Sequence, residues 1–335
     1  MMIDPIELTR TLVALETTTG HEGPAVDLLA SLLGQLGYRV TRQPVTPGRD
    51  NIYAWREPPV VVFSTHLDCV PPFLPLSEDQ ACLHGRGTCD AKGLAAAMVA
   101  AAEQLADSGE RRIGLLFVVG EENGSDGAAA AASLGPKGRF LINGEPTENQ
   151  LSLGQKGTLK VVLEATGRAA HSAYPDEGHS AISPLLDALE RIRRLPLPTD
   201  PMLGAGTLNI GIVQAGVAPN VFAPSARAEL LFRTVEPTGA LRAAITAAAG
   251  TAVAVSFPTE LPCYKNLSAP PAGWATTVVS FASDLSILTG WGGGYQLGPG
   301  TIRVAHTSEE RISKVELLEG VRLYVKLARE LIGRE

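Results

Sequence analysis

Apolar and polar positions along the first part of the chain follow the periods of an α/β protein. Short, largely apolar runs at Val60–Phe63, Ile113–Val119 and Arg139–Ile142 predict strands that are buried on both faces. One helical pattern precedes them, at about Gly23–Leu36, and another, the alanine-rich stretch Ala91–Ala106, lies between the first and second strands. Buried strands that alternate with helices indicate a mainly parallel, doubly wound sheet with helices on both faces.

Helix signals also mark the two ends of the chain. Asp4 can cap a first helix, Pro5 suits its first position, and Glu7 completes a capping box. A long helical pattern at about Glu309–Ile332 predicts a helix that closes the chain.

The middle of the chain has a different order of expected elements, β-α-β-β-α-β, which is that of a small ferredoxin-like α+β domain. We therefore predict a discontinuous catalytic domain, residues 1–156 and 265–335, with a smaller domain inserted at residues 157–264. The expected strands of the inserted domain are Leu159–Thr166, Leu208–Gln214, Ala226–Thr234 and Thr251–Phe257, and its expected helices are Ser180–Arg194 and Pro237–Ala249.

Composition narrows the class of protein. The 335 residues are 45% hydrophobic, which is enough for sizeable cores, and the net charge of -7 argues against nucleic acid or a membrane surface as partner. No apolar run approaches the roughly 20 residues that span a bilayer. The N-terminus has neither a basic start nor an apolar segment typical of an export signal. We therefore expect a cytoplasmic protein whose four cysteines are free thiols.

Residues that commonly bind metals gather where the predicted strands end. In open α/β sheets, ligands bind beyond the carboxyl ends of the strands, so these side chains are expected to share one crevice. The candidates are His66, Asp68, Asp90, Glu121, Glu122, Glu145 and, far downstream, His306.

This set suits two adjacent zinc ions. Each ion needs about four imidazole or carboxylate ligands, and a pair about 3.5–4 Å apart needs one carboxylate as a bridge. A further carboxylate must stay off the metals to act as general base. Asp68 follows His66 by two residues, so on extended chain both side chains face one side, and Asp68 could accept the second imidazole proton.

Five segments resemble the metal-site motifs of the aminoacylase, acetylornithine deacetylase and succinyl-diaminopimelate desuccinylase family of dinuclear zinc metallopeptidases. They occur in the family's order and cover the predicted catalytic domain from end to end. The segments are Ser64–Pro71, Gly85–Gly93, Gly120–Glu122, Gly144–Thr147 and Ala305–Thr307.

The resemblance implies a role for each residue of the set. Glu121 is expected to be the general base and later the acid, and Asp68 is expected to orient His66. The implied ligands of two zinc (or cobalt) ions are Asp90 as the bridge, His66 and Glu145 at one ion, and Glu122 and His306 at the other.

The inserted domain carries further family motifs. The segment Gly167–Pro175 resembles the histidine motif of the family's lid domain, which implies that His171 donates to the developing oxyanion, often across a dimer into the partner's site. Asn220 and Arg233 match positions that grip the substrate carboxylate, a task for which the guanidinium fork is well shaped. The resemblance thus implies a homodimer formed through the lid domain.

The implied activity is the hydrolysis of a linear amide that removes the acyl group from a small N-acyl amino acid. The compact lid and the short chain most resemble acetylornithine deacetylase, an enzyme of arginine biosynthesis. Succinyl-diaminopimelate desuccinylase, a dipeptidase, and a hydrolase that frees lysine or ornithine from an acidic carrier protein are alternatives, and the acidic net charge argues mildly against the last. A non-catalytic binding or dimerisation module on the same fold would lack a ligand or the base, and neither is missing.

Overall fold

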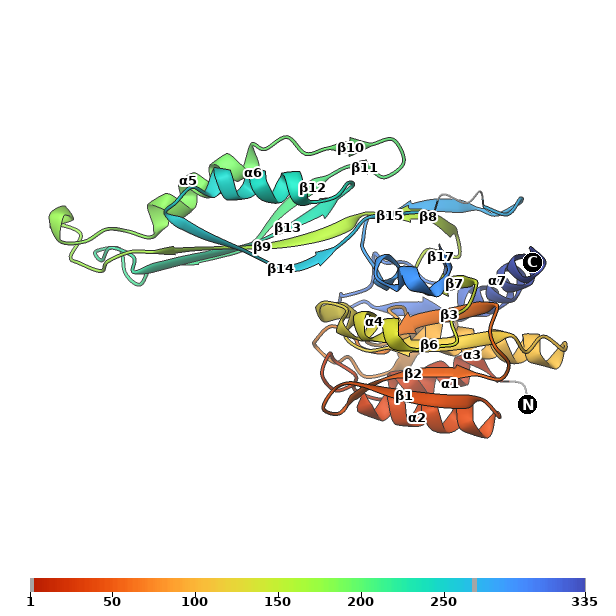
Figure 1. Cartoon of the computed structure of the whole chain (residues 1–335). Coiled ribbons are helices and arrows are strands. Elements are labelled where there is room, and N and C mark those ends of the chain that lie inside the picture. The colour runs from red at the N-terminus through yellow and green to blue at the C-terminus, as the bar shows by residue number, and fades with distance from the viewer. Residues whose placement is uncertain (1–2, 267–269, 335) are drawn as a thin grey trace. The chain divides into compact units, whose positions relative to one another are not determined.

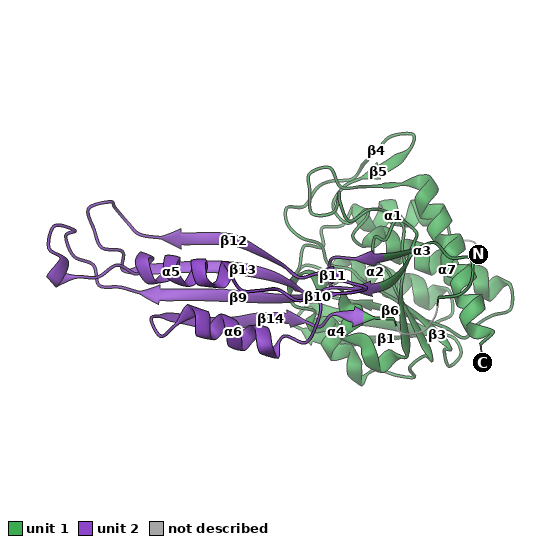
Figure 2. Ribbon diagram, turned by 90° about the horizontal axis from the view of Figure 1, so that it is seen from above, with its two compact units in different colours: residues 1–153, 265–277, 283–335 green, residues 154–264, 278–282 purple. Residues whose placement is uncertain are grey.

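The computed structural model describes residues 3–266 and 270–334, which form two compact units (Figure 1; Figure 2). The first unit holds residues 1–153, 265–277 and 283–335, and the second holds residues 154–264 and 278–282. The sequence places residues 278–282 in the catalytic domain instead. The structure assigns them to the second unit because the main chain of Val279 accepts a hydrogen bond from Lys156 there, at 3.2 Å.

A nine-stranded mixed sheet forms the framework of the first unit. Its central strands are parallel and its outer strands are antiparallel. Across the sheet the strands are β1 (Arg39–Thr46), β2 (Arg49–Trp55), β6 (Ile113–Val118), β3 (Val61–His66), β7 (Phe140–Asn143), β17 (Gly293–Gln296), β8 (Leu151–Gln155) and β15 (Tyr264–Lys265), with β16 (Thr276–Val279) beside β8.

The parallel centre consists of β6, β3, β7 and β17, as the alternation of strands and helices predicts. Every residue of β3 and β6 is buried, in keeping with the apolar runs Val61–Phe63 and Ile113–Val118. The hairpin of β1 and β2 was not predicted. Most residues of β1 are exposed and polar, so the strand lacks the apolar run that marks a buried one.

The helices of the first unit follow the predicted pattern with one correction. The Asp4 carboxylate caps the first helix by accepting from the main chain of Ile6 and Glu7, as predicted. The last helix begins at Lys314, not at Glu309, because the intervening residues pair as a strand. The helices are α1 (Pro5–Val13), α2 (Gly23–Gln35), α3 (Lys92–Asp107), α4 (Asp126–Ala130) and α7 (Lys314–Ile332).

The alanine-rich helix α3 is buried over most of its length, against α1, α7 and the strands β3 and β6. Small side chains allow this close approach. At its start, a Cβ on Gly93 would lie 2.2 Å from the main-chain oxygen of Thr88, so only glycine fits there. Among the described residues, no helix has both the length and the apolar character needed to cross a bilayer.

A small antiparallel sheet joins two segments that are distant in the sequence. It consists of β4 (Ser77–Glu78), β5 (Cys82–His84) and β18 (Arg311–Ser313), in the order β18-β5-β4. The chain runs from β5 directly into the loop that ends at Asp90, and β18 follows shortly after His306. This sheet therefore ties together the two segments that carry these residues.

The second unit has its own core and a four-stranded antiparallel sheet in the order β12-β13-β9-β14. Along β13 every second residue is buried, which shows that one face of the sheet packs against α5 and the other is more open. In chain order its main elements are β9 (Gly157–Thr166), α5 (Ile182–Arg193), β12 (Thr207–Ala215), β13 (Ser225–Thr234), α6 (Gly239–Ala249) and β14 (Val253–Leu261), with the short hairpin β10 (Thr199–Asp200) and β11 (Gly204–Ala205) before β12.

Candidate metal centre

The carboxylate of Asp90 lies between two imidazoles in the first unit. Its Oδ1 is 3.0 Å from Nε2 of His66, and its Oδ2 is 3.2 Å from Nε2 of His306. Nε2 of His306 is also 2.9 Å from Oε1 of Glu122. A carboxylate with an imidazole at each oxygen is the arrangement that a bridge between two metal ions needs.

Adjacent strands of the parallel centre bring these residues together. His66 ends β3, Glu121 and Glu122 follow β6 in the short 3-10 helix η1 (Glu121–Asn123), and Glu145 follows β7. Since β6, β3 and β7 are parallel neighbours, their carboxyl ends meet at one edge of the sheet. Asp90 reaches this edge from the loop before α3.

Asp68 is fully buried and organises two parts of the centre. Its Oδ1 accepts a hydrogen bond from the main chain of Glu121 at 3.0 Å, and its Oδ2 accepts from that of Glu122 at 3.1 Å. Nδ1 of His66 is 2.9 Å from the main-chain oxygen of Asp68 and 3.5 Å from Oδ1. The nearer partner of the imidazole is therefore the main chain, whereas the carboxylate mainly fixes the backbone of the two glutamates.

The carboxyl groups of Glu145 and Glu121, at the same edge of the sheet, have more acidic than basic neighbours. Burial, followed by the charges of Asp90, Asp284 and Glu122, raises the pKa of Glu145 well above its usual range. Burial also raises the pKa of the half-buried Glu121, with Glu145 among the repelling neighbours. Oε1 of Glu145 has no hydrogen-bond partner among the described residues.

The two imidazoles compensate part of this negative charge. Hydrogen bonds to Asp90 and Glu122 raise the pKa of His306 to about 10. Burial lowers the pKa of His66, but hydrogen bonds to Asp68 and Asp90 outweigh it and raise that pKa above its usual value. Metal ions bound here would displace protons from these ligands and would supply positive charge in their place. Ligand atoms of His66, Asp90 and Glu122 lie within 4.8 Å of one another, so the residues fit a metal site.

Glu310, which was not predicted as a site residue, holds the loop that carries Asp90. Its Oε1 accepts from the main chain of Gly87 at 2.8 Å, of Asp90 at 3.2 Å and of Cys89 at 3.3 Å. Its Oε2 pairs with the buried guanidinium of Arg86. The sequence offers no local signal for Glu310, because the helical pattern extends back to about Glu309 and includes it.

Asp284 is a second residue of this region that was not predicted from the sequence. It begins the short 3-10 helix η4 (Asp284–Ser286) and is 1% exposed. Burial raises the pKa of its carboxyl group to about 7, while the hydroxyl of Ser125 lowers it. Asp284 thus adds another buried acid whose charge acts on Glu121. The irregular segment around it gave no periodic signal.

The remaining predicted residues lie in the second unit, at opposite ends of its sheet. His171 forms a β-bridge with Val221, and the main chain of Ser172 donates to that of Asn220 at 3.0 Å. Arg233 is near the far end of β13, where its guanidinium donates to Oγ1 of Thr158 at 2.6 Å. The structure brings His171 and Asn220 together and separates both from Arg233.

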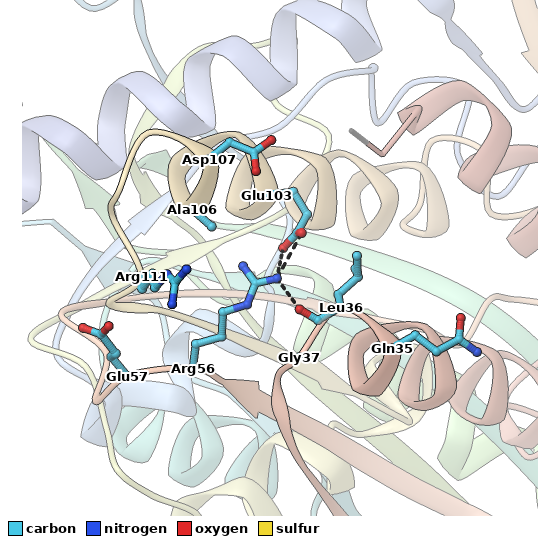
Figure 3. Close-up of a pocket in the computed structure, with 9 residues that line it drawn as sticks. All are labelled: Gln35, Leu36, Gly37, Arg56, Glu57, Glu103, Ala106, Asp107 and Arg111. Atoms are coloured by element: carbon cyan, nitrogen blue, oxygen red, sulfur yellow. Dashed lines mark hydrogen bonds and ion pairs between the residues drawn. The ribbon is translucent and has the colours of Figure 1, made fainter. Parts of the chain in front are cut away.

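A cavity of about 500 Å³ lies elsewhere in the first unit (Figure 3). It is formed by the ends of α2, β2 and α3 and contains none of the predicted metal ligands. Figure 3 shows the guanidinium of Arg56 pointing at Glu103 and at the main-chain oxygen of Leu36. The guanidinium of Arg56 is therefore not available to bind a ligand, and nothing in this cavity indicates a catalytic role. The candidate site is the cluster of metal-type ligands around Asp90.

The chain belongs to peptidase family M20/M25/M40, whose profile matches residues 62–330. It is 37% identical to a probable carboxypeptidase of Neosartorya fischeri, over 97% of this chain and 86% of the relative. It is 36% identical to a peptidase M20 domain-containing protein of Schizosaccharomyces pombe, over 96% of this chain and 83% of the relative. The protein is therefore a hydrolase that acts on amide bonds.

Several solved structures share the mixed α/β fold with its central, mostly parallel sheet. A tripeptidase from Staphylococcus aureus superposes with a TM-score of 0.79 at 22% identity, covering 98% of this chain and 100% of the other. A metallo-carboxypeptidase from Sulfolobus solfataricus gives 0.79 at 15% identity, covering 98% and 99%. A dinuclear metal binding peptidase from Bacillus subtilis gives 0.68 at 14%, covering 98% and 95%.

Replacing Glu310 with Gln tests its hold on the Asp90 loop. The change leaves the buried Arg86 without a counter-charge, and breaking a buried pair in this way costs about 3–5 kcal/mol. We expect a matching loss in the free energy of unfolding from urea denaturation and weaker metal retention on dialysis. Glu309→Gln, at the exposed neighbouring position, is the matched control. Equal stability and metal content in the two variants would remove Glu310 from this role.

Proposed function

We propose that this protein is a two-metal amide hydrolase that cleaves the bond to the α-nitrogen of an amino acid with a free carboxylate. The observation that carries the proposal is the Asp90 carboxylate with an imidazole at each oxygen. The carboxyl of Glu121 lies close enough for the charges of His66 and Glu145 to act on it. Such a reaction needs a carboxylate that bridges two metal ions, further ligands for each ion, and a separate carboxyl group that carries protons.

The proposed ligands of two zinc or cobalt ions are Asp90 between them, His66 and Glu145 at one, and Glu122 and His306 at the other. When bound, such ions would polarise the scissile carbonyl and lower the pKa of a water molecule. The protein's part is to hold the ligands in place, which Asp68 and Glu310 do through main-chain hydrogen bonds.

Glu121 is the proposed proton carrier. It takes a proton from the attacking water and gives it to the leaving amine, which is the work of a general base and then a general acid. Burial raises the pKa of Glu121, which makes its carboxylate a stronger base than an ordinary one and suits it to accept this proton. The main-chain N–H of Glu121 donates to the carboxylate of Asp68, and this hydrogen bond fixes the position of the Glu121 backbone.

The sequence motifs favour N-acetyl-L-ornithine as substrate, whereas the names of the relatives favour a peptide cut at its carboxyl end. The two reactions share the leaving group, an amino acid with a free α-carboxylate, and differ only on the acyl side. Arg233 is the proposed partner of that carboxylate, because its planar fork can bind both oxygens. Because the relatives are named as peptidases, we propose a peptide as the first candidate substrate and N-acetyl-L-ornithine as the second.

We propose that the second unit is a ferredoxin-like lid and that two chains form a homodimer through it. Its edge strand β12 exposes Ile212 at 45% and Val213 at 50%, and α5 exposes Leu186 at 55%. His171 forms a β-bridge with Val221, four residues before β13 begins at Ser225. Arg233 lies eight residue steps further along that strand, about 27 Å from Ser225 at the rise of a strand. Within one chain, His171 and Arg233 thus cannot touch the same small substrate, which supports His171 and Asn220 acting on the partner's substrate.

Three substrates test the proposal: N-acetyl-L-ornithine, a neutral dipeptide, and the same dipeptide with its carboxyl end amidated. With zinc-loaded enzyme, we expect kcat/KM for one of the free acids to exceed that for the amide by 10²-fold or more, about 2.7 kcal/mol. Glu121→Gln should lower kcat by roughly 10²–10⁴ with metal content unchanged. Glu57→Gln, at the exposed rim of the distant cavity, is the control. Equal rates for acid and amide, or normal turnover of Glu121→Gln, would refute the proposal.

Mixed dimers test the shared site. Glu121→Gln removes the base of one chain, and His171→Ala removes the proposed oxyanion donor that serves the other. Each variant alone should be nearly inactive, whereas co-refolded mixtures should regain activity, because one of the two sites then has both residues. A mixture as inactive as its parents, although sedimentation shows mixed dimers, would place both residues in the same chain's site.

A further inference from the structure

A turn between two short strands brings three different metal-type ligands together. Oδ1 of Asp79 accepts from the main chain of Ala81 and of Cys82, both at 2.7 Å, so the turn itself fixes the carboxylate. Oδ2 of the same carboxylate is 3.1 Å from Nε2 of His84. Ligand atoms of Asp79, Cys82 and His84 all lie within 4.8 Å of one another.

Strand geometry places the thiol and the imidazole side by side. Cys82 and His84 are two residues apart on β5, so they project from the same face of the strand. Leu83 between them points the other way and is fully buried in the core. Both ligands are half-buried, so they are backed by protein and still open to solvent on one side.

We propose that Asp79, Cys82 and His84 form a separate site for a zinc-type divalent cation. Thiolate, imidazole and carboxylate together favour zinc over magnesium or calcium, which prefer oxygen ligands. Ligands arranged tetrahedrally around zinc stand about 3.5 Å apart at ordinary bond lengths, so the observed spacing needs only small side-chain rotations. Three protein ligands leave one position for water.

The charges around the turn are compatible with such a cation. The main-chain donor of Cys82 and the side chain of His84 lower the pKa of Asp79 to about 2, so this ligand is ionised at neutral pH. Nζ of Lys314 is held by the main-chain oxygen of Asp79 at 2.6 Å and lies 3.3 Å from Oε2 of Glu78. Glu78 is shared between Lys314 and Arg10, and Arg10 also pairs with Glu7, so these two cations are matched by two carboxylates. A divalent ion with one carboxylate and one thiolate is itself neutral.

The site is distinct from the Asp90 centre but lies on the sheet that supports it. In β18, Arg311 pairs with His84 and Ser313 with Cys82. One end of this sheet continues into the loop of Asp90, and the other follows the segment of His306 and Glu310. A cation on the hairpin would therefore stabilise the framework without touching the reacting groups.

Cobalt(II) is the probe that separates the two sites. The proposed ligands of the Asp90 centre include no sulfur, so a near-ultraviolet thiolate-to-cobalt charge-transfer band reports a cysteine ligand. After loading with two equivalents of zinc, wild-type protein should show this band saturating at one added equivalent of cobalt. Cys82→Ser should abolish it with kcat/KM unchanged, while Cys263→Ser, at the other half-buried cysteine, should retain it. Absence of the band in wild type, or its persistence in Cys82→Ser, would overturn the proposal.

Alkylation of the unmodified protein gives a second test that does not depend on a folded variant. Iodoacetamide labelling, followed residue by residue with mass spectrometry, should be at least tenfold slower at Cys82 in the presence of zinc, because a bound thiolate is a poor nucleophile. The rate at Cys263 should be the same with and without zinc. Equal rates at Cys82 in the two conditions would rule out a zinc–thiolate bond there.

Discussion

Repulsion among buried carboxylates at one edge of the central sheet is the constraint on which the rest of the structure depends. Asp90, Glu122 and Glu145 lie near one another in a region that also holds Glu121 and Asp284. Like charges cannot all ionise in so small a buried space unless cations or protons neutralise them. The raised pKa of Glu145 and the imidazoles on both sides of Asp90 express that shortage of positive charge.

The surrounding fold keeps these groups together against their repulsion. The parallel strands β3, β6 and β7 end at this edge and carry His66, the two glutamates at 121 and 122, and Glu145. The carboxylates of Asp68 and Glu310 hold the loops between them by accepting main-chain hydrogen bonds. Gly93 allows α3 to begin in contact with Thr88, where any side chain would collide with the main chain. The same small sheet that ties the Asp90 loop to the His306 segment carries the hairpin of Asp79, Cys82 and His84.

The sequence predicts the parts of this arrangement that follow from local pattern. Apolar runs mark β3 and β6; His66 is the last residue of β3, and Glu121 comes three positions after the end of β6. The motifs also gave Asp90 and His306, whose meeting depends on chain segments far apart in the sequence.

Other parts could not be predicted because long-range contacts determine them. The polar strand β1 is held by its hydrogen bonds to β2 and has no apolar period of its own. Glu310 has its role through the distant loop at Gly87–Asp90, so nothing in its own neighbourhood distinguishes it from the exposed Glu309. For the same reason residues 278–282 join the second unit only through contacts such as that of Lys156 with Val279.

The central claim is that the acidic edge is a site for two metal ions that share Asp90. Anomalous scattering from crystals of the zinc-loaded protein, recorded on both sides of the zinc absorption edge, tests it most directly. The account predicts two peaks, one on each side of the Asp90 carboxylate, about 3.5–4 Å apart. Zinc-edge data with no peak at Asp90, or with a single peak that Asp90 does not bridge, would contradict it.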